Sequence, residues 1–531
     1  MINGAIIWVL TLFLVSGSPP GVHADQNSPA QASNSPGKPA LPDYTDTTTR
    51  HALQFGDRHL VYTATTGALP IHDTLRQPQG TMFYVSYTMQ DADLTQRPIT
   101  FVLNGGPGAA AVYLHLGALG PKRLVLNDDG TLPPAPARLT DNPFTWLIFT
   151  DLVFIDPIGT GYSRSIQQDD KQKQPPKFWG IEEDLQSLET FIQLYLTRQQ
   201  RWLSPKFLAG ESYGGFRVAA LSARLQAETR IALNGVLLIS PALEFSLLTG
   251  DHYHVLPWVL RLPSYAAVAR FHGKASWPQD AGQELAAVQT IVEHFSLTEV
   301  LPGLAQGDRL ADIQAQALYT RLAQAIGVPG ELLRRSRGRL SPGVFAKTLL
   351  QETHRLLSLY DGSVTAIDPT PEHPVHTGQD PRLDQLSAAF TATFNSYVRE
   401  ELHFVTDVPY HTLNTTVSKA WDWRSGINAP QGFAGTADPL KTALSHNPSL
   451  YAFIAHGYYD LVTPYFSSVF VVHQMALDEA IQSHMVLKVY AGGHMFYTHA
   501  VAHEQLWRDV HGFFHRAIPG SVPPPNASSR P

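Results

Sequence analysis

Residues Gly210-Glu211-Ser212-Tyr213-Gly214-Gly215 are the stretch on which our fold prediction rests. They match the pattern G-x-S-x-G, in which a serine stands between glycines. Residues 206–209 before them are short and apolar like a buried strand, and residues 216–225 are rich in Ala, Leu and Arg like a helix. A sharp strand-to-helix turn requires small flanking residues and lifts the serine hydroxyl out of the sheet. We therefore predict a nucleophile elbow at Ser212; the alternative is an ordinary glycine turn.

Strand and helix patterns alternate on both sides of this stretch. Such alternation indicates a mostly parallel sheet with helices on both faces. We therefore predict an α/β fold with a central sheet flanked by helices. The expected strands are residues 60–64, 82–87, 99–103, 152–156, 235–240, 450–455 and 485–490, and the clearest expected helices are residues 181–198 and 501–517.

Strand patterns stop between residues 245 and 445, where helical patterns take over. This change predicts a large, mainly helical insertion that sits over the sheet as a cap. Residues 369–381, with scattered Pro and His, are expected to be a loop within it. The core is then predicted in two parts, residues 49–244 and residues 446–518.

The first 24 residues contain no Asp, Glu, Lys or Arg, carry an apolar run, and finish Val22-His23-Ala24. This pattern predicts a cleaved export signal over residues 1–24, hence a periplasmic or secreted protein without a membrane anchor after cleavage. The alternative is a membrane anchor, but the apolar run is shorter than the roughly 20 residues that a bilayer span needs. Residues 25–48 and the Pro-rich residues 519–531 are predicted to be disordered.

The composition of the 531 residues excludes several classes of function. With 44% hydrophobic and 16% charged residues, the chain is expected to be globular. Its net charge of -7 and its lack of basic runs argue against a nucleic-acid partner. The chain has no cysteine, so disulfides and thiol catalysis are excluded. His252 and His254 have a spacing that metal ligands can share, but no third ligand motif supports them, so we expect neither a metal nor a cofactor.

A second glycine-rich turn, Asn104-Gly105-Gly106-Pro107-Gly108, follows the predicted strand 99–103. Glycines at a strand end leave backbone N–H groups open to a ligand, as an oxyanion hole requires. We prefer this interpretation to a plain turn, because hydrolases of this architecture take one oxyanion donor from the loop after an early strand.

Ser212, Asp460 and His494 each stand just past a predicted strand, at the edge where open α/β sheets bind ligands. A serine hydroxyl needs an imidazole to take its proton, and the imidazole needs a carboxylate to fix its tautomer. Alone, Asp460 could be a helix cap, and one histidine among 23 carries little weight. The order nucleophile, acid, base at three strand ends favours a catalytic triad.

Four spaced motifs now resemble the serine carboxypeptidases, peptidase family S10. They are residues 104–108, 156–163, 210–214 and 493–495. The resemblance implies an α/β-hydrolase fold with a helical insertion. It also implies removal of C-terminal residues from peptides through an acyl-enzyme, usually at acid pH, with peptides that have a free C-terminus as partners.

Position by position, the resemblance makes Ser212 the nucleophile, His494 the base and Asp460 the residue that orients the base. The oxyanion donors would be the backbone N–H groups of Gly106 and Tyr213.

The substrate's terminal carboxylate would be held by Asn104, the backbone of Gly105 and Glu211, and Met495 would contribute to the substrate site. One departure bears on this: Ala118 stands where the family's carboxypeptidases typically have a glutamate that shares a proton with the acid beside the nucleophile. Another is the run Ala109-Ala110-Ala111, where the family usually has Cys and Ser.

These features leave three hypotheses for the activity. The first is an exported serine carboxypeptidase-like hydrolase. The second, motivated by Ala118, is an esterase or acyltransferase on the same scaffold, because acyl-enzyme chemistry serves peptides and esters alike. The third is a binding protein on an inactive hydrolase scaffold, which the complete triad disfavours.

Overall fold

The structure is a computed structural model, and it describes residues 41–42, 44–56, 58–73, 75–166, 177–277, 282–376, 378–424 and 433–518. The predicted export signal, the predicted disordered tail and most of the predicted lead-in lie outside the described residues. The first two residues of strand β1 (Thr47–Phe55) fall within the predicted lead-in, because the strand's backbone pairs with the next strand. No helix in the described part of the chain is both long and apolar enough to cross a bilayer.

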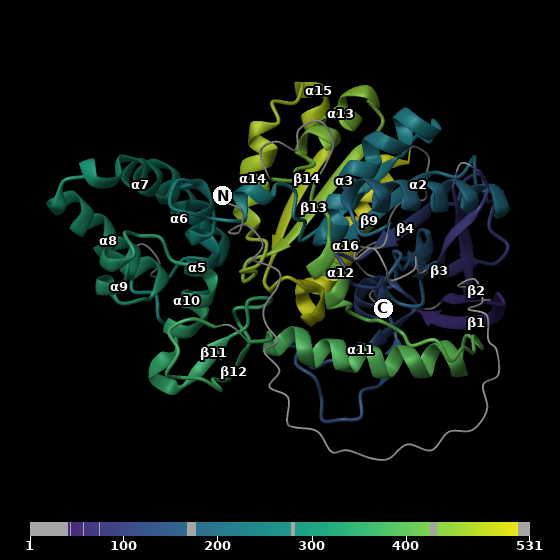
Figure 1. Ribbon diagram of the computed structural model, residues 1–531, viewed down its shortest axis with the longest axis horizontal. Helices are drawn as coiled ribbons and strands as arrows, with labels where there is room; N and C mark the ends of the chain where they lie inside the picture. Colours follow the sequence, from purple (N-terminus) through teal and green to yellow (C-terminus); the bar gives the residue numbers. More distant parts are fainter. Residues whose placement is uncertain are drawn as a thin grey trace, which may run out of the picture.

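A mixed sheet of ten strands forms the centre of the described chain (Figure 1). Six neighbouring strands are parallel, which confirms the predicted mostly parallel sheet. The parallel strands, in spatial order, are β7 (Asp151–Ile155), β4 (Ile99–Leu103), β9 (Lys206–Glu211), β10 (Gly235–Ile239), β13 (Tyr451–Gly457) and β14 (Met485–Tyr490). The antiparallel strands at one side are β1, β2 (Arg58–His72), β3 (Pro78–Met89) and the short β8 (Arg164–Ser165).

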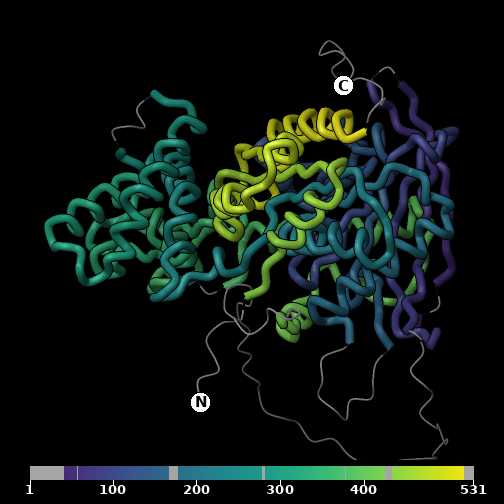
Figure 2. The backbone as a smooth tube through the Cα atoms, turned by 90° about the horizontal axis from the view of Figure 1, so that it is seen from above, coloured from purple at the N-terminus to yellow at the C-terminus, as the bar shows by residue number. Residues whose placement is uncertain are grey.

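Helices cover both faces of the sheet. On one face α2 (Ile181–Arg198), α3 (Tyr213–Arg224) and α13 (Ala437–His446) bury their apolar sides in one hydrophobic cluster. On the other face α16 (Ala500–Ala517) packs in a second cluster, and Figure 2 shows it in yellow along one side of the α/β body. The predicted helix over residues 181–198 is confirmed in its bounds, because its apolar residues recur at helical spacing.

The helical insertion begins and ends at one place on the core. The Phe245 N–H donates to the Ala434 carbonyl at 3.1 Å, and the Thr436 N–H donates to the Leu243 carbonyl at 2.9 Å. Six helices from within it form a lobe with its own apolar cluster, which stands beside the sheet in Figure 1 and not over it. They are α5 (Leu262–Phe271), α6 (Leu285–Phe295), α7 (Leu301–Gln306), α8 (Asp312–Ile326), α9 (Gly330–Arg335) and α10 (Pro342–Thr348).

The long helix α11 (Pro381–Glu400) follows a short hairpin of β11 (Arg355–Leu357) and β12 (Thr365–Ile367), and runs across the lower side of the α/β body in Figure 1. The loop of this hairpin reaches the core, since the carbonyl of Tyr360 accepts a 2.5 Å hydrogen bond from the His494 N–H. The remaining helices are α1 (Val112–Leu114), α4 (Leu256–Leu260), α12 (Thr415–Ala420), α14 (Tyr465–Gln474) and α15 (Glu479–Gln482).

Candidate active site

Ser212 occupies a strained turn between β9 and α3. Its backbone has φ 61° and ψ -123°, and residues other than glycine rarely adopt a positive φ. A Cβ atom on Gly210 would collide with the carbonyl of Gly214, so the turn requires small residues on both sides of the serine. The Ser212 N–H donates to the Ile239 carbonyl at 2.9 Å and ties the turn to the neighbouring strand. This is the geometry of a nucleophile elbow.

Asp460 and His494 meet directly, although they follow different strands. Nδ1 of His494 lies 2.7 Å from Oδ2 of Asp460, and both side chains are buried. The other carboxylate oxygen, Oδ1, accepts hydrogen bonds from the N–H groups of Val462 at 2.8 Å and Thr463 at 2.9 Å. The carboxylate is therefore fixed by its own turn, and it sets the orientation of the imidazole.

The electrostatics of the pair favour a charged imidazole. Burial lowers the pKa of His494, but the charge and hydrogen bond of Asp460 raise it more, so that its pKa lies above the ordinary value. In the neutral imidazole Nδ1 carries the proton, because it faces a carboxylate, and this leaves Nε2 as the proton acceptor. Such a pair can take a proton from a hydroxyl and stabilise the cation that forms.

Ser212 stands at the same sheet edge as this pair, since β9 and β13 flank β10 in the parallel part of the sheet. Among the residues that the structure describes, its hydroxyl has no hydrogen-bond partner, whereas the link from His494 to Asp460 is formed. Serine–imidazole contacts of this kind often tighten only around a substrate.

The loop after β4 lies against the elbow. A Cβ atom on Gly105 would approach the backbone nitrogen of Tyr213 to 2.5 Å and Cβ of Ser212 to 2.9 Å, so only glycine fits there. Gly106 has φ +100°, which again favours glycine. Tyr213 is the first residue of α3, so no helical carbonyl precedes its N–H. The two predicted oxyanion donors therefore belong to segments that touch beside Ser212.

Glu211 is buried directly before Ser212, and both of its carboxyl oxygens have a hydrogen-bond donor. The amide nitrogen of Asn104 donates to Oε2, and the hydroxyl of Tyr497 donates to Oε1 at 2.8 Å. Burial raises the pKa of Glu211 to about 7, against the lowering effects of His494, Tyr497 and Asn104. Near neutral pH this carboxyl group can therefore exist with or without its proton.

Ala118 lies in a π-helical turn, His115–Leu119, and its side chain supplies no polar group to Glu211. Its carbonyl accepts hydrogen bonds from Asn142 at 2.7 Å and from Nε2 of His503 at 3.0 Å. The preceding residue packs on the ring that does reach Glu211: a Cβ atom on Gly117 would lie 2.9 Å from Cε2 of Tyr497.

Three residues at this site were not predicted from the sequence. Tyr497 and Thr463 each stand three residues past a predicted triad member, and this spacing within the same turns is the only signal that could have found them. Tyr360 comes from the insertion and has no local signal. Its ring meets that of His494 edge-on, with the centroids 5.2 Å apart.

The remaining predicted site residue, Met495, is buried next to His494 and belongs to the cluster under α16. Its carbonyl accepts the hydroxyl of Thr498 at 2.7 Å. The ring of Tyr213 stacks on Phe216, so the predicted role of Tyr213 concerns its backbone N–H alone.

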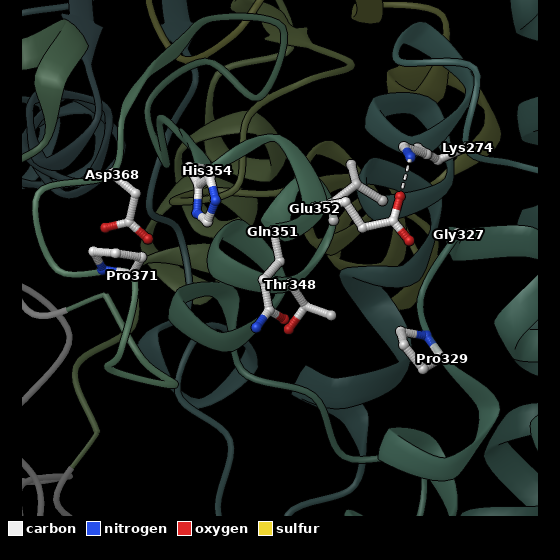
Figure 3. A pocket seen from close by; sticks show the side chains of 10 residues that line it. Lys274, Gly327, Pro329, Thr348, Gln351, Glu352, His354, Asp368 and Pro371 are labelled. Atoms are coloured by element: carbon white, nitrogen blue, oxygen red, sulfur yellow. Dashed lines mark hydrogen bonds and ion pairs between the residues drawn. The ribbon is translucent and has the colours of Figure 1, made fainter.

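Two cavities lie away from this site. Figure 3 shows one of about 590 Å³ in the helical lobe, with Lys274, Glu352 and Asp368 among its lining residues. Another of about 820 Å³ lies between α2, α3 and α13, beside Phe216 and His446. Neither is lined by a residue of the predicted triad.

The chain is similar to serine carboxypeptidases over most of its length. A sequence profile described as serine carboxypeptidase matches residues 66–484. The pheromone-processing carboxypeptidase KEX1 of Yarrowia lipolytica is 30% identical over 174 residues, which is 32% of this chain and 25% of that protein. The lysosomal protective protein of Mus musculus is 27% identical over 163 residues, which is 30% of this chain and 31% of that protein. The chain thus matches less than a third of the length of both these curated relatives.

A solved structure has a fold similar to that of this chain. The crystal structure of KEX1(delta)p, a prohormone-processing carboxypeptidase from Saccharomyces cerevisiae, has a TM-score of 0.52 at 16% identity. The match covers 84% of this chain and 91% of that chain. It confirms the predicted α/β-hydrolase fold.

Proposed function

Because the chain belongs to the serine carboxypeptidase family, we propose that it releases C-terminal residues from peptides through an acyl-enzyme on Ser212. The observation that carries this proposal is the buried carboxyl of Glu211, held by Asn104 and Tyr497 directly beside the nucleophile. A neutral carboxyl in that place can bind the carboxylate that marks the end of a peptide.

In the acylation step of this proposal, the triad activates Ser212. Oγ of Ser212 attacks the carbonyl carbon of the last peptide bond while its proton passes to Nε2 of His494, and Asp460 stabilises the resulting cation. The N–H groups of Gly106 and Tyr213 bind the negative oxygen of the tetrahedral intermediate. The C–N bond then breaks, and the proton on His494 moves to the leaving amine.

Deacylation repeats these proton transfers with water. His494 takes a proton from the water that attacks the ester carbonyl, and the C–O bond to Ser212 breaks as that proton passes to its Oγ. The shortened peptide leaves with a new C-terminal carboxylate, so the cycle can begin again on the next residue.

Recognition of the terminal carboxylate depends on the protonation of Glu211. Below its pKa of about 7 the carboxyl can donate its proton to the substrate's carboxylate. The amide of Asn104 and the backbone of Gly105 supply further donors in this proposal. Above that pKa, two negative groups would face one another in a buried site, which disfavours binding.

The proposal can be tested with pairs of N-blocked dipeptides that differ only at the C-terminus. When it is tested from pH 4 to 8, the purified protein should hydrolyse the free acid and should leave the corresponding amide almost untouched. Failure to release any C-terminal residue, or equal rates on the acid and the amide, would overturn the proposal.

A second candidate activity is ester hydrolysis or acyl transfer. It is favoured by the absence of an acid side chain at Ala118, since Glu211 then has a phenol as its companion. Turnover of N-blocked amino acid esters without any cleavage of free-acid peptides would establish it in place of the first.

We also propose that the protein is exported. The support is the uncharged, apolar pattern of residues 1–24. Cell fractionation and N-terminal sequencing should find a mature protein that begins at Asp25 outside the cytoplasm, whereas an intact Met1 on cytoplasmic protein would contradict export.

A further inference from the structure

We propose that Tyr497 is a substrate-positioning residue: its hydroxyl holds Glu211 in the orientation that binds the terminal carboxylate of the peptide. This inference rests on the proposed carboxypeptidase function and goes beyond it, because it gives the phenol of Tyr497 a part, together with Glu211, in recognising the terminal carboxylate.

Two loops each supply one hydrogen-bond donor to the Glu211 carboxyl. Tyr497 lies in the 3-10 turn Phe496–Thr498, three residues after the catalytic histidine, and donates to Oε1 at 2.8 Å. Asn104, from the loop after β4, donates to Oε2. Each oxygen is thus held by one donor, and each keeps one lone pair for a proton or a ligand. With both donors in place the carboxyl plane cannot rotate.

A glycine beside the phenol ring of Tyr497 leaves space for this ring. Gly117 lies against its ring edge, where a Cβ atom would come within 2.9 Å of Cε2, and the ring of Phe496 lies at 66° to it with centroids 6.0 Å apart. Tyr497 is 1% exposed. A buried tyrosine with one strong acceptor has one stable position for its hydroxyl, so Gly117 contributes to the placement of Glu211 through the ring.

The charges around the pair keep the phenol protonated. Burial and the neighbouring Glu211 raise the pKa of Tyr497 well above its ordinary range. Two other groups act on the pKa of Glu211: His494 lowers it and Asp460 raises it. The charge of Glu211 in turn raises the pKa values of the phenols of Tyr113 and Tyr360. The pair therefore has one titrating group, unlike two carboxyls that share a proton.

Loss of the hydroxyl should affect binding more than chemistry. In Tyr497→Phe the Glu211 carboxyl loses one of its two donors, so it can rotate away from the substrate. We expect KM for free-acid peptides to rise about tenfold, with a much smaller change in kcat. The hydroxyl also stabilises the ionised carboxylate, so its loss should raise the pKa of Glu211. The alkaline limb of the pH profile should accordingly move to higher pH.

A matched control is Tyr490→Phe. Tyr490 is a buried residue at the end of strand β14, shortly before His494. Its hydroxyl donates to Oδ2 of Asp509 at 2.9 Å. This variant loses the same kind of hydrogen bond without touching Glu211, so its KM and its pH profile should match those of the wild type. A second variant, Gly117→Ala, displaces the ring of Tyr497 by contact and should shift KM in the same direction as Tyr497→Phe.

The experiment measures KM and kcat for an N-blocked dipeptide and for its methyl ester, from pH 5 to 9, in all four proteins. The inference is supported if Tyr497→Phe and Gly117→Ala raise KM for the acid alone and the alkaline limb of Tyr497→Phe moves up. It is overturned if acid and ester are affected equally, or if neither KM nor the limb moves, while the wild type still cleaves the acid. Wild-type protein that cleaves no free-acid peptide would instead refute the proposed function, and this inference with it.

Discussion

The hydroxyl oxygen of Thr463 lies 2.7 Å from Oδ2 of Asp460, the same carboxylate oxygen that faces the imidazole of His494. It also lies 3.0 Å from the carbonyl of Ser240, at the end of the neighbouring strand. Thr463 therefore links the acid to the loop after β10, and we expect it to keep the carboxylate aligned with His494.

Replacing this hydroxyl should weaken catalysis without removing it. In Thr463→Val the Asp460 carboxylate keeps its two backbone donors but loses the side-chain one, so kcat should fall about tenfold with KM nearly unchanged. Thr463→Ser, which retains the hydroxyl, should keep most of the activity. Steady-state kinetics on an N-blocked dipeptide would measure both, and equal kcat values for the Val variant and the wild type would show that the hydroxyl is not needed.

Asp460→Asn should be far more damaging. The amide oxygen can still accept from the Val462 and Thr463 N–H groups, but its NH2 would then face Nδ1 of His494 and favour the wrong tautomer. We expect kcat to fall by about 10⁴-fold. Circular dichroism would check that the fold is retained, and a folded variant with a loss below tenfold would exclude Asp460 as the partner of His494.

The pH dependence should differ between free acids and esters. His494 must be neutral to act as a base, so activity on both substrates should rise with pH through the raised pKa of this imidazole. Glu211 must be protonated to bind a carboxylate, so activity on the acid alone should fall as pH increases through about 7. Profiles of kcat/KM for an acid and its ester would reveal the difference, and identical profiles would mean that Glu211 does not contact the carboxylate.

The same carboxyl should make stability depend on pH. The pKa of Glu211 is raised in the folded protein, so its contribution to stability is full below the ordinary glutamate pKa and is lost as pH rises through about 7. Glu211→Gln removes this titration. The free energy of unfolding of the variant relative to wild type should therefore shift in favour of the variant by about 2 kcal/mol between pH 5 and pH 8. Denaturant unfolding at both pH values would measure it, and a constant difference would contradict the burial of an ionisable Glu211.

The sequence predicted those elements whose pattern is local. The helix at residues 181–198 and the strand at residues 485–490 have the predicted bounds, because periodicity alone identifies them. Strand β2 extends eight residues beyond the predicted 60–64, to His72, because its pairing with β3 along its length outweighs Gly67 and Pro70, which otherwise favour breaks.

The parts of the site that could not be predicted depend on contacts between distant positions. Strand ends identify Ser212 and His494, whereas the hydrogen bond from Tyr497 to Glu211 joins residues 286 positions apart. Helical periodicity likewise predicts helices in the insertion but not their position beside the sheet. Tyr360 reaches His494 only because the β11–β12 hairpin folds back on the core.

Mass spectrometry of a peptide mixture, incubated with wild-type protein and with Ser212→Ala, tests both the reaction and its direction. We predict that the wild type shortens peptides stepwise from the C-terminus and leaves C-terminal amides intact, and that Ser212→Ala leaves every peptide unchanged. Internal cleavage, shortening from the N-terminus, or equal shortening by Ser212→Ala would contradict a serine carboxypeptidase that uses this elbow.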